Sequence, residues 1–317
     1  MTALRRGLMA LLLVPVLLLT GCGVFGGGDA EGPHEIAGGF PSGIYYGYGQ
    51  ELATAMGEGG VEITVVETDG SVENLRRVGG GESLLGFAQA DTAADAVAGE
   101  GAFDQPMPIR AAARLYDEYV HVLVHADSEI DSLEDFAGRR VSLGAEDSGV
   151  SVVASRVLEA AGVTVDDVDD AELGLDGAIS AMRRGTIEGF FWVGGVPTPG
   201  LDRLTETTPI RLIPIETAIA EEINAAHGGV YRTAEFPVGV YERTSPTPTI
   251  TVPNLLIASE AAPDAVVEAA LETLFASRMQ MAQTVPAAAL LDLRQAIYTM
   301  PIELHPGAVD YYRQTRR

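Results

Sequence analysis

The sequence predicts an α/β protein built from two lobes with a cleft between them. Residues 61–99 alternate between strand-like and helix-like segments joined by short turns, and a second alternating series follows from residue 119. Strands and helices in this order form mainly parallel sheets with helices on their faces. Extended apolar segments join the two series, and a helical tail follows them. We therefore expect each series to form one lobe with a mainly parallel sheet.

The first series has a local signal for each of its elements. Ser71 and Asp91 each stand where a helical pattern begins, and serine and aspartate are preferred N-cap residues. Apolar runs rich in β-branched residues and bounded by turn residues are typical of strands. The expected elements are a helix over 51–56, a strand over 61–68, a helix over 71–81, a strand over 84–89 and a helix over 91–99.

The second series begins with the strand-like run YVHVLVHAD. Ser132 then opens a short helix in Ser-Leu-Glu-Asp, which is similar to a capping box. The further expected elements are a strand passing into a loop over 139–149, helices over 151–162 and 179–185, strands over 188–195, 210–215 and 249–259, a helical region over 263–297 and a last helix over 305–317.

The first residues predict an export signal. Arg5 and Arg6 precede an apolar run over 7–19, and Leu-Thr-Gly-Cys22 follows at once, as in a bacterial lipoprotein signal. The apolar run is shorter than the roughly 20 residues of a comfortable spanning helix. Cys22 is the only cysteine of the chain. We expect cleavage of residues 1–21, acylation of Cys22, and an extracytoplasmic protein anchored to the cell membrane through a Gly-rich tether over 22–33.

Composition excludes several classes of function. The net charge is −25, and all 20 basic residues are arginines. Without lysine the chain has no Schiff-base lysine and no phosphate-loop lysine. An acidic chain is also a poor match for the phosphates of nucleic acid. The absence of lysine fits either codon bias or adaptation to salt, and the sequence leaves both open.

The loops between strands and helices are the candidate binding positions, because ligands of open α/β sheets bind beyond the carboxyl ends of the strands. Small and hydroxyl residues gather where helices begin, which leaves backbone N–H groups for an anion. Glycines in the first of these loops let the backbone approach a ligand, and its tyrosines offer rings and hydroxyls. The loops span 38–49, 68–74, 88–91, 144–151 and 192–199.

Alternative interpretations exist for most of these residues. The tyrosines and Trp192, the only tryptophan, fit core packing as well as ligand contact. Ser71, Asn74 and Asp91 fit helix capping as well as ligand contact. An enzyme is the rival hypothesis, but no Gly-x-Ser-x-Gly elbow occurs, and His121 and His125 share one face of a strand without a third ligand nearby. We therefore expect no catalytic residue, metal or cofactor.

Several longer motifs resemble one known family. They are TDGSVENLRRV, FAQADTAADAVAGEGAF, LYDEYVHVLVHADSEIDSLEDFAGRRVSLGAEDSG, FFWVGGVPTP and ELHPGAVDYYR. Together they resemble the TAXI family of solute receptors, which serve TRAP (tripartite ATP-independent periplasmic) transporters. The resemblance runs from about residue 38 to 312. It implies a periplasmic-binding-protein fold of type II-like architecture, with lobe 1 over 34–122 and 250–317 and lobe 2 over 123–249.

The resemblance also implies a solute, a partner and a site. The solute would be a small carboxylate or an acidic amino acid such as glutamate or 2-oxoglutarate, delivered to the permease subunits in the membrane. A ligand-sensing lipoprotein of the same fold, acting on a signalling partner, is the alternative. The implied ligand contacts are Gly43, Tyr45, Tyr46, Thr68, Ser71, Asn74, Gln89 and Asp91 on lobe 1, and Ser148, Gly149, Val150, Ser151, Trp192, Gly195, Pro197 and Thr198 on lobe 2.

The chain departs from the family pattern in two loops. Phe40-Pro41-Ser42 stands where relatives are richer in threonine and glycine. Glu146 and Asp147 lie in the second-lobe loop and bring two carboxylates to an expected anion site. If either carboxylate faces the cleft, an ammonium group on the solute becomes the better match.

Overall fold

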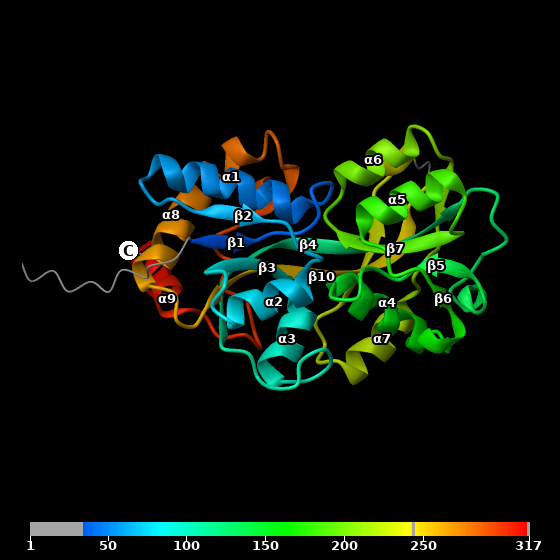
Figure 1. The fold of residues 1–317 in the computed structure, drawn as a ribbon, viewed down its shortest axis with the longest axis horizontal. Coiled ribbons are helices and arrows are strands. Elements are labelled where there is room, and N and C mark those ends of the chain that lie inside the picture. Colours follow the sequence, from blue (N-terminus) through cyan, green and yellow to red (C-terminus); the bar gives the residue numbers. More distant parts are fainter. Residues whose placement is uncertain (1–33, 243–244, 316–317) are drawn as a thin grey trace, which may run out of the picture. The chain divides into compact units, whose positions relative to one another are not determined.

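The computed structural model describes residues 34–242 and 245–315 (Figure 1). The predicted export signal, Cys22 and the tether lie outside the described residues. Contacts gather the described residues into one compact unit. Strands alternate with helices along this unit, so the predicted α/β class is confirmed.

The strands form a single sheet in the order β2-β1-β3-β10-β4-β7-β5-β6, with β8 beside β4 and β9 beside β10. Two groups within it are parallel, β2-β1-β3 and β7-β5-β6. The strands are β1 (Glu35–Ala37), β2 (Thr64–Val66), β3 (Leu85–Gln89), β4 (Ile109–His125), β5 (Arg140–Ser142), β6 (Asp169–Asp170), β7 (Gly189–Gly194), β8 (Ile210–Leu212), β9 (Arg232–Phe236) and β10 (Thr247–Ser259).

Strands β4 and β10 join the two parallel groups. They pair antiparallel with each other, and β10 also pairs with β3 while β4 also pairs with β7. With 17 and 13 residues, β4 and β10 are long enough to belong to both groups. We call the part around β2-β1-β3 lobe 1 and the part around β7-β5-β6 lobe 2. The numerical lobe boundaries stay a prediction, because the same two strands run through both.

Helices cover both faces of the sheet (Figure 1). Neighbouring strand residues point to opposite faces, so Phe87 packs with the core under α1, α8 and α9, whereas Ala88 packs with the core under α2 and α3. A third core fills lobe 2. The helices are α1 (Ile44–Glu58), α2 (Ser71–Gly79), α3 (Ala90–Ala98), α4 (Gly149–Ala160), α5 (Leu175–Arg184), α6 (Pro199–Thr205), α7 (Thr217–Ala226), α8 (Asp264–Met281) and α9 (Pro306–Thr315).

Several predicted element boundaries were wrong. The N-cap of α2 is Gly70 and not Ser71, and the N-cap of α3 is Gln89 and not Asp91. The strand expected over 119–127 begins ten residues earlier, at Ile109. The helix expected from Ser132 is a single 3₁₀ turn over Glu134–Phe136. The helical region expected over 263–297 is α8 followed by a 3₁₀ turn over Pro286–Leu290, because Pro286 cannot continue an α-helix.

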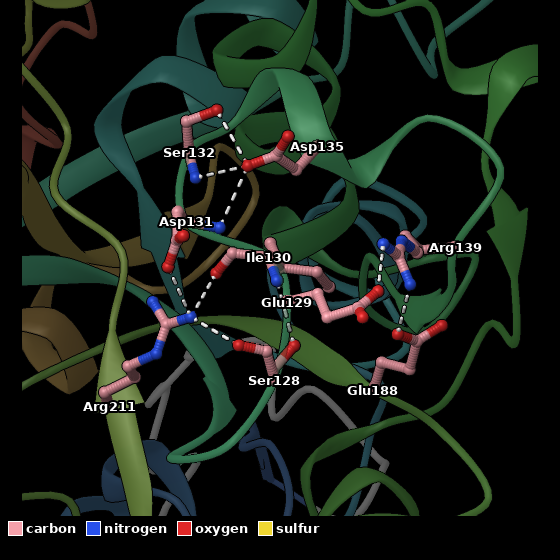
Figure 2. A network of polar contacts seen from close by, with 9 residues as sticks. All are labelled: Ser128, Glu129, Ile130, Asp131, Ser132, Asp135, Arg139, Glu188 and Arg211. Carbon is pink, nitrogen blue, oxygen red and sulfur yellow. Dashed lines mark hydrogen bonds and ion pairs between the residues drawn. The ribbon is translucent and has the colours of Figure 1, made fainter.

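Exposed polar contacts fix the loop after β4 in lobe 2 (Figure 2). The Arg211 guanidinium on β8 donates to the carbonyl oxygens of Ser128 and Ile130, at 2.8 and 2.6 Å, and pairs with Asp131 at 2.8 Å. Arg139 pairs with Glu129 and Glu188 on the other side of the loop. All of these contacts join residues of lobe 2 to one another.

Candidate functional site

A cavity lies between the two lobes. It encloses about 390 Å³, including the space at its mouth that opens to solvent. Lobe 1, the loop before α1 and the middle of β4 supply one wall, and the start of α4 and the end of β7 supply the other. The lining residues are Gly39, Phe40, Gly43, Ile44, Tyr45, Asp69, Gly70, Ser71, Gln89, Glu118, Ser148, Gly149, Val150, Trp192, Val193 and Gly194.

Three helices begin at the cavity. The N-cap and first residues of α1, α2 and α4 all belong to its lining. The first N–H groups of a helix have no partner within the helix, and the helix dipole makes them favourable to negative charge. In α4 the Ser148 hydroxyl accepts from Ser151 N at 3.1 Å, which caps one of these groups. The arrangement suits a small anionic group on the side where α2 and α4 begin.

Glycines allow the lobes to approach each other around the cavity. Gly70 has φ +122°, a conformation that favours glycine, and a Cβ on it would lie 3.8 Å from Ser148 Cα across the cleft. A Cβ on Gly149 would overlap Gln89 Oε1 and lie 2.7 Å from Ser71 Oγ. Backbone hydrogen bonds also join the lobes, from Glu73 N to Asp147 O at 3.0 Å and from Gly200 N to Ser42 O at 3.1 Å. The described structure is thus a closed arrangement of the two lobes.

Glu118 lies on β4 in the cavity lining and is 1% exposed. The Tyr45 hydroxyl donates to its Oε2 at 2.9 Å, and the Tyr116 hydroxyl donates to its Oε1 at 3.1 Å. Burial raises the pKa of Glu118 to about 8, although the hydrogen bonds from the two tyrosines and from Gln89 act in the opposite direction. A carboxyl that changes charge near neutral pH is therefore part of the cavity wall.

Half of the predicted contacts line the cavity and half do not. Those in the lining are Gly43, Tyr45, Ser71, Gln89, Ser148, Gly149, Val150 and Trp192. Those outside the lining are Tyr46, Thr68, Asn74, Asp91, Ser151, Gly195, Pro197 and Thr198. The residues outside the lining are placed by the structure in supporting roles, which differ from one to the next.

Thr68 and Asn74 hold the loop that precedes α1. The Thr68 hydroxyl lies 2.9 Å from the carbonyl oxygen of Gly38 and 2.6 Å from Asn74 Oδ1. The Asn74 amide donates to the carbonyl oxygens of Gly38 and of Phe87. Tyr46, which follows in α1, lies against Gly38 as well. These side chains fix the course of the Gly38 loop and leave contact with the cavity to its later residues.

Asp91 forms an ion pair across the lobes. Its carboxylate lies 2.9 Å from Arg156 Nη1 on α4 and accepts a hydrogen bond from the Tyr231 hydroxyl. Arg156 also pairs with Asp95 on α3 at 2.5 Å. Asp91 is fully buried, and Arg156 is 8% exposed. Contact between Asp91 and the solute stays a prediction, and in this structure the carboxylate links α3 to α4.

Thr198 and its neighbours position Trp192. The indole Nε1 of Trp192 donates to Thr198 Oγ1 at 3.1 Å, and the same hydroxyl donates to the carbonyl oxygen of Gly195 at 2.7 Å. The Val196–Pro197 peptide between them is cis. The turn over 195–198 therefore acts on the cavity through the Trp192 ring.

Ser151, in α4, donates its backbone N–H to the capping hydroxyl of Ser148.

The predicted contacts did not include Glu118, Phe40, Ile44, Asp69 or Gly70, although all but Glu118 lie in loops that the sequence analysis named. A signal for Glu118 was present, because it alternates with Tyr116 and Val120 on one face of the strand, and both neighbours are buried. Glu146 and Asp147 are absent from the lining. Asp147 instead pairs with Arg76 on α2 at 2.5 Å, at the rim of the cleft.

His121 belongs to the core of lobe 2. It is fully buried, and its ring nitrogens lie 2.9 Å from Tyr119 O and 3.2 Å from the Tyr241 hydroxyl. Burial lowers its pKa to about 3, so the imidazole is neutral.

Within residues 34–242 and 245–315, no group of three or more His, Cys, Asp or Glu is placed to hold a metal ion. Helices of this same part of the chain are all too short or too polar to cross a membrane.

Solved structures with the same architecture exist. A protein described as a periplasmic transporter superposes with a TM-score of 0.55 at 13% identity, over 90% of this chain and 92% of that chain. A Bordetella bronchiseptica RB50 protein gives 0.51 at 18% identity, over 89% and 88%. A putative L-cystine ABC transporter from Listeria monocytogenes gives 0.50 at 12% identity, over 82% and 98%. The expected periplasmic-binding-protein fold is thereby confirmed.

One protein-family model covers nearly all of the described residues. It is the model of the NMT1-like family, and it matches residues 36–315. The match includes both lobes and every residue that lines the cavity. The chain belongs to the NMT1-like family.

Proposed function

We propose that this protein is an extracytoplasmic solute-binding receptor. It captures a small carboxylate or an acidic amino acid, for which glutamate and 2-oxoglutarate are model solutes, and delivers it to a TRAP permease as a TAXI-family lipoprotein anchored through Cys22. One observation carries the proposal: a cavity between two lobes at which α1, α2 and α4 all begin. The fold shared with a periplasmic transporter supports it.

The mechanism is capture by closure, without chemistry on the solute. A solute that touches the starts of α2 and α4 together binds only when the lobes are closed, so it shifts the equilibrium toward the closed form. Polar groups in the cavity then discriminate between solutes, because a wrong solute leaves buried donors or acceptors unpaired. The closed form would offer the permease a surface to which both lobes contribute.

Thermal-shift screening of the full-length protein tests this function. The panel contains amino acids, dicarboxylates, 2-oxo acids and, as a contrast, neutral sugars. A solute at 100 times its Kd adds about 2.7 kcal/mol to the free energy of unfolding, which such a screen detects. We expect a dose-dependent rise in Tm with at least one carboxylate and none with sugars.

A glycine pair provides the matched variants. Gly149→Ala places a methyl group against Gln89 and Ser71 in the closed cleft, and we expect it to abolish the solute-induced shift. Gly57→Ala on α1 meets nothing within 4 Å and should retain the shift. No shift with any carboxylate would refute the receptor. If a solute raises Tm but cells take it up equally well without the protein, the ligand-sensing lipoprotein is favoured over transport.

A further inference from the structure

We propose that the floor of the cavity, formed by the lining residues Glu118, Tyr45 and Gln89 and supported by Tyr116 outside the lining, is a subsite for a protonated amine. The solute is then an amino acid and not the oxo acid of the same carbon skeleton. This inference rests on the proposed receptor function and names its class of solute. It is carried by the hydrogen-bonding polarity of four side chains from three different elements.

The floor of the cavity presents acceptors. When Glu118 is ionised, both of its oxygens accept a phenolic proton, from Tyr45 at 2.9 Å and from Tyr116 at 3.1 Å, and the carboxylate has no donor of its own. Gln89 is 2% exposed and lines the same cavity, and its Oε1 has no hydrogen-bond partner in the part of the chain that the structure describes. An ammonium group has three N–H donors and no acceptor. It therefore complements Glu118 and Gln89 together.

Charge leads to the same conclusion. The lining contains two acidic residues, Glu118 and Asp69, and among the described residues that line it none is arginine or histidine. The chain contains no lysine. A buried carboxylate that ionises without a cation nearby is costly. A cationic group on the solute would remove that cost, whereas a second acceptor on the solute would increase it.

Burial keeps Glu118 uncharged while the cavity holds no cation, although the hydrogen bonds from the side chains around it favour the ionised form. Tyr45 faces it from α1, Tyr116 from its own strand and Gln89 from β3, and the Asp91 carboxylate on α3 disfavours its ionisation. On β10 the residue opposite Glu118 is Val252, which has no charge. Burial accordingly raises the pKa of Glu118 to about 8. An arriving ammonium group stabilises the ionised form, so near neutral pH the proton leaves Glu118 for the solvent when the amine binds.

The rest of the cavity suits the other end of an amino acid. The starts of α2 and α4 provide backbone N–H groups for one carboxylate. Phe40, Ile44 and Trp192 provide apolar contact around the solute. A 2-oxo acid would present its keto oxygen to Gln89 Oε1, where acceptor meets acceptor, and the protonated form of Glu118 would be its one donor among these side-chain carboxyl and carbonyl groups.

Calorimetry with matched pairs of solutes tests the subsite. The full-length protein is titrated with L-glutamate and 2-oxoglutarate, and with L-leucine and 4-methyl-2-oxopentanoate, so that each pair differs only in amine against keto oxygen. We expect the amine to bind about 100-fold more tightly in at least one pair. Titrations at pH 6.5 in two buffers of different ionisation enthalpy should show release of close to one proton per amine bound.

Two variants assign the effect to Glu118. Glu118→Gln keeps the shape of the side chain and removes its charge, and we expect it to remove both the preference for the amine and the proton release. Glu146→Gln removes an exposed charge near the cleft but outside the cavity lining, and it should retain both. If Glu118→Gln fails to fold, the solute pairs and the proton release of the unmodified protein still decide.

The outcomes separate the subsite from the receptor function. Equal or tighter binding of the keto acids would overturn the amine subsite and leave the receptor intact. A preference for the amine that survives in Glu118→Gln, or that occurs without proton release, would also overturn it. If no member of either pair binds or raises Tm, and the wider panel is equally silent, the receptor function fails and the subsite fails with it.

Discussion

Asp91 and Glu118 are both acidic residues with 1% exposure, and they meet burial in opposite ways. Asp91 is paired with Arg156 of the opposite lobe and receives a hydrogen bond from Tyr231. Glu118 receives hydrogen bonds from two tyrosines, and no cation lines its cavity among the described residues. Asp91 has a cationic partner in the closed form, whereas Glu118 has none among the described residues of the lining. We infer that Asp91 serves closure and that Glu118 serves the solute.

Removal of Arg156 should have the largest effect on this contrast. Arg156→Met leaves Asp91 and Asp95 without a cation in the closed form, and breaking a buried pair costs about 3–5 kcal/mol. Because opening the cleft returns both carboxylates to water, we expect the cost to fall on closure, with Kd for the best solute raised at least 100-fold. Calorimetry and small-angle scattering measure both quantities. A lower Tm with an unchanged Kd would mean that Arg156 stabilises the fold alone.

The pH dependence of stability should follow Glu118. Its pKa is raised to about 8 in the folded protein, against 4.5 without the fold. Between these values the folded state holds a proton that the unfolded state has lost, so the unfolding free energy falls as pH rises, by at most about 1.4 kcal/mol per pH unit. Denaturant unfolding of the solute-free protein from pH 4.5 to 8 measures this. In Glu118→Gln the unfolding free energy should change less with pH than in the unmodified protein. If the two proteins show the same dependence on pH, the raised pKa of Glu118 is contradicted.

Tyr231→Phe tests the Asp91 side more gently. The change removes only the hydroxyl that donates to Asp91 and keeps the ring in the core. A hydrogen bond to a charged group contributes about 1.5–3 kcal/mol, so we expect solute Kd to rise about tenfold. Tyr312→Phe offers a control, because its hydroxyl donates to the carbonyl oxygen of Ala112 and lies outside both the Asp91 network and the cavity lining. Equal effects of the two changes would remove the special role of Asp91.

Exposed arginine pairs should have the smallest effects. Arg211→Met breaks the contacts of Figure 2, but its partner Asp131 is 83% exposed and all the residues belong to lobe 2. Exposed pairs contribute about 0–1 kcal/mol. We expect a Tm lower by a few degrees at most and an unchanged Kd. A change in Kd as large as that of Arg156→Met would show that loss of any guanidinium, buried or exposed, disturbs closure.

The alternation of strands and helices could be predicted from the sequence because it is a local pattern. The early part of β4 could not, because the half-buried residues Arg110, Arg114 and Asp117 interrupt its apolar pattern. Its strand pairing comes from β10, which lies more than a hundred residues away in the chain. Non-local pairing of this kind leaves little trace in a short window.

The candidate site could be predicted by loop but not by side chain. The helix-start loops 38–49, 68–74 and 144–151 all reach the cavity. Asn74 and Asp91 nevertheless lie outside its lining. Asn74 donates hydrogen bonds to the carbonyl oxygens of Gly38 and Phe87, and Asp91 pairs with Arg156. A capping residue, a loop support and a ligand contact have the same residue types, and only the three-dimensional partners distinguish them.

The position of Glu118 on β4 sets an order of events. Its neighbour Tyr119 is where β4 pairs with β10 on one side and with β7 of lobe 2 on the other, so Glu118 stands at the passage between the lobes. If the lobes turn about the strands that they share, Glu118 would stay near the axis while the outer loops move. We therefore expect the solute to contact Glu118 first, while the cleft is still open. The N-termini of α2 and α4 contact it afterwards, when the lobes close. Arrival would then be limited by diffusion, and departure by the rate at which the lobes part.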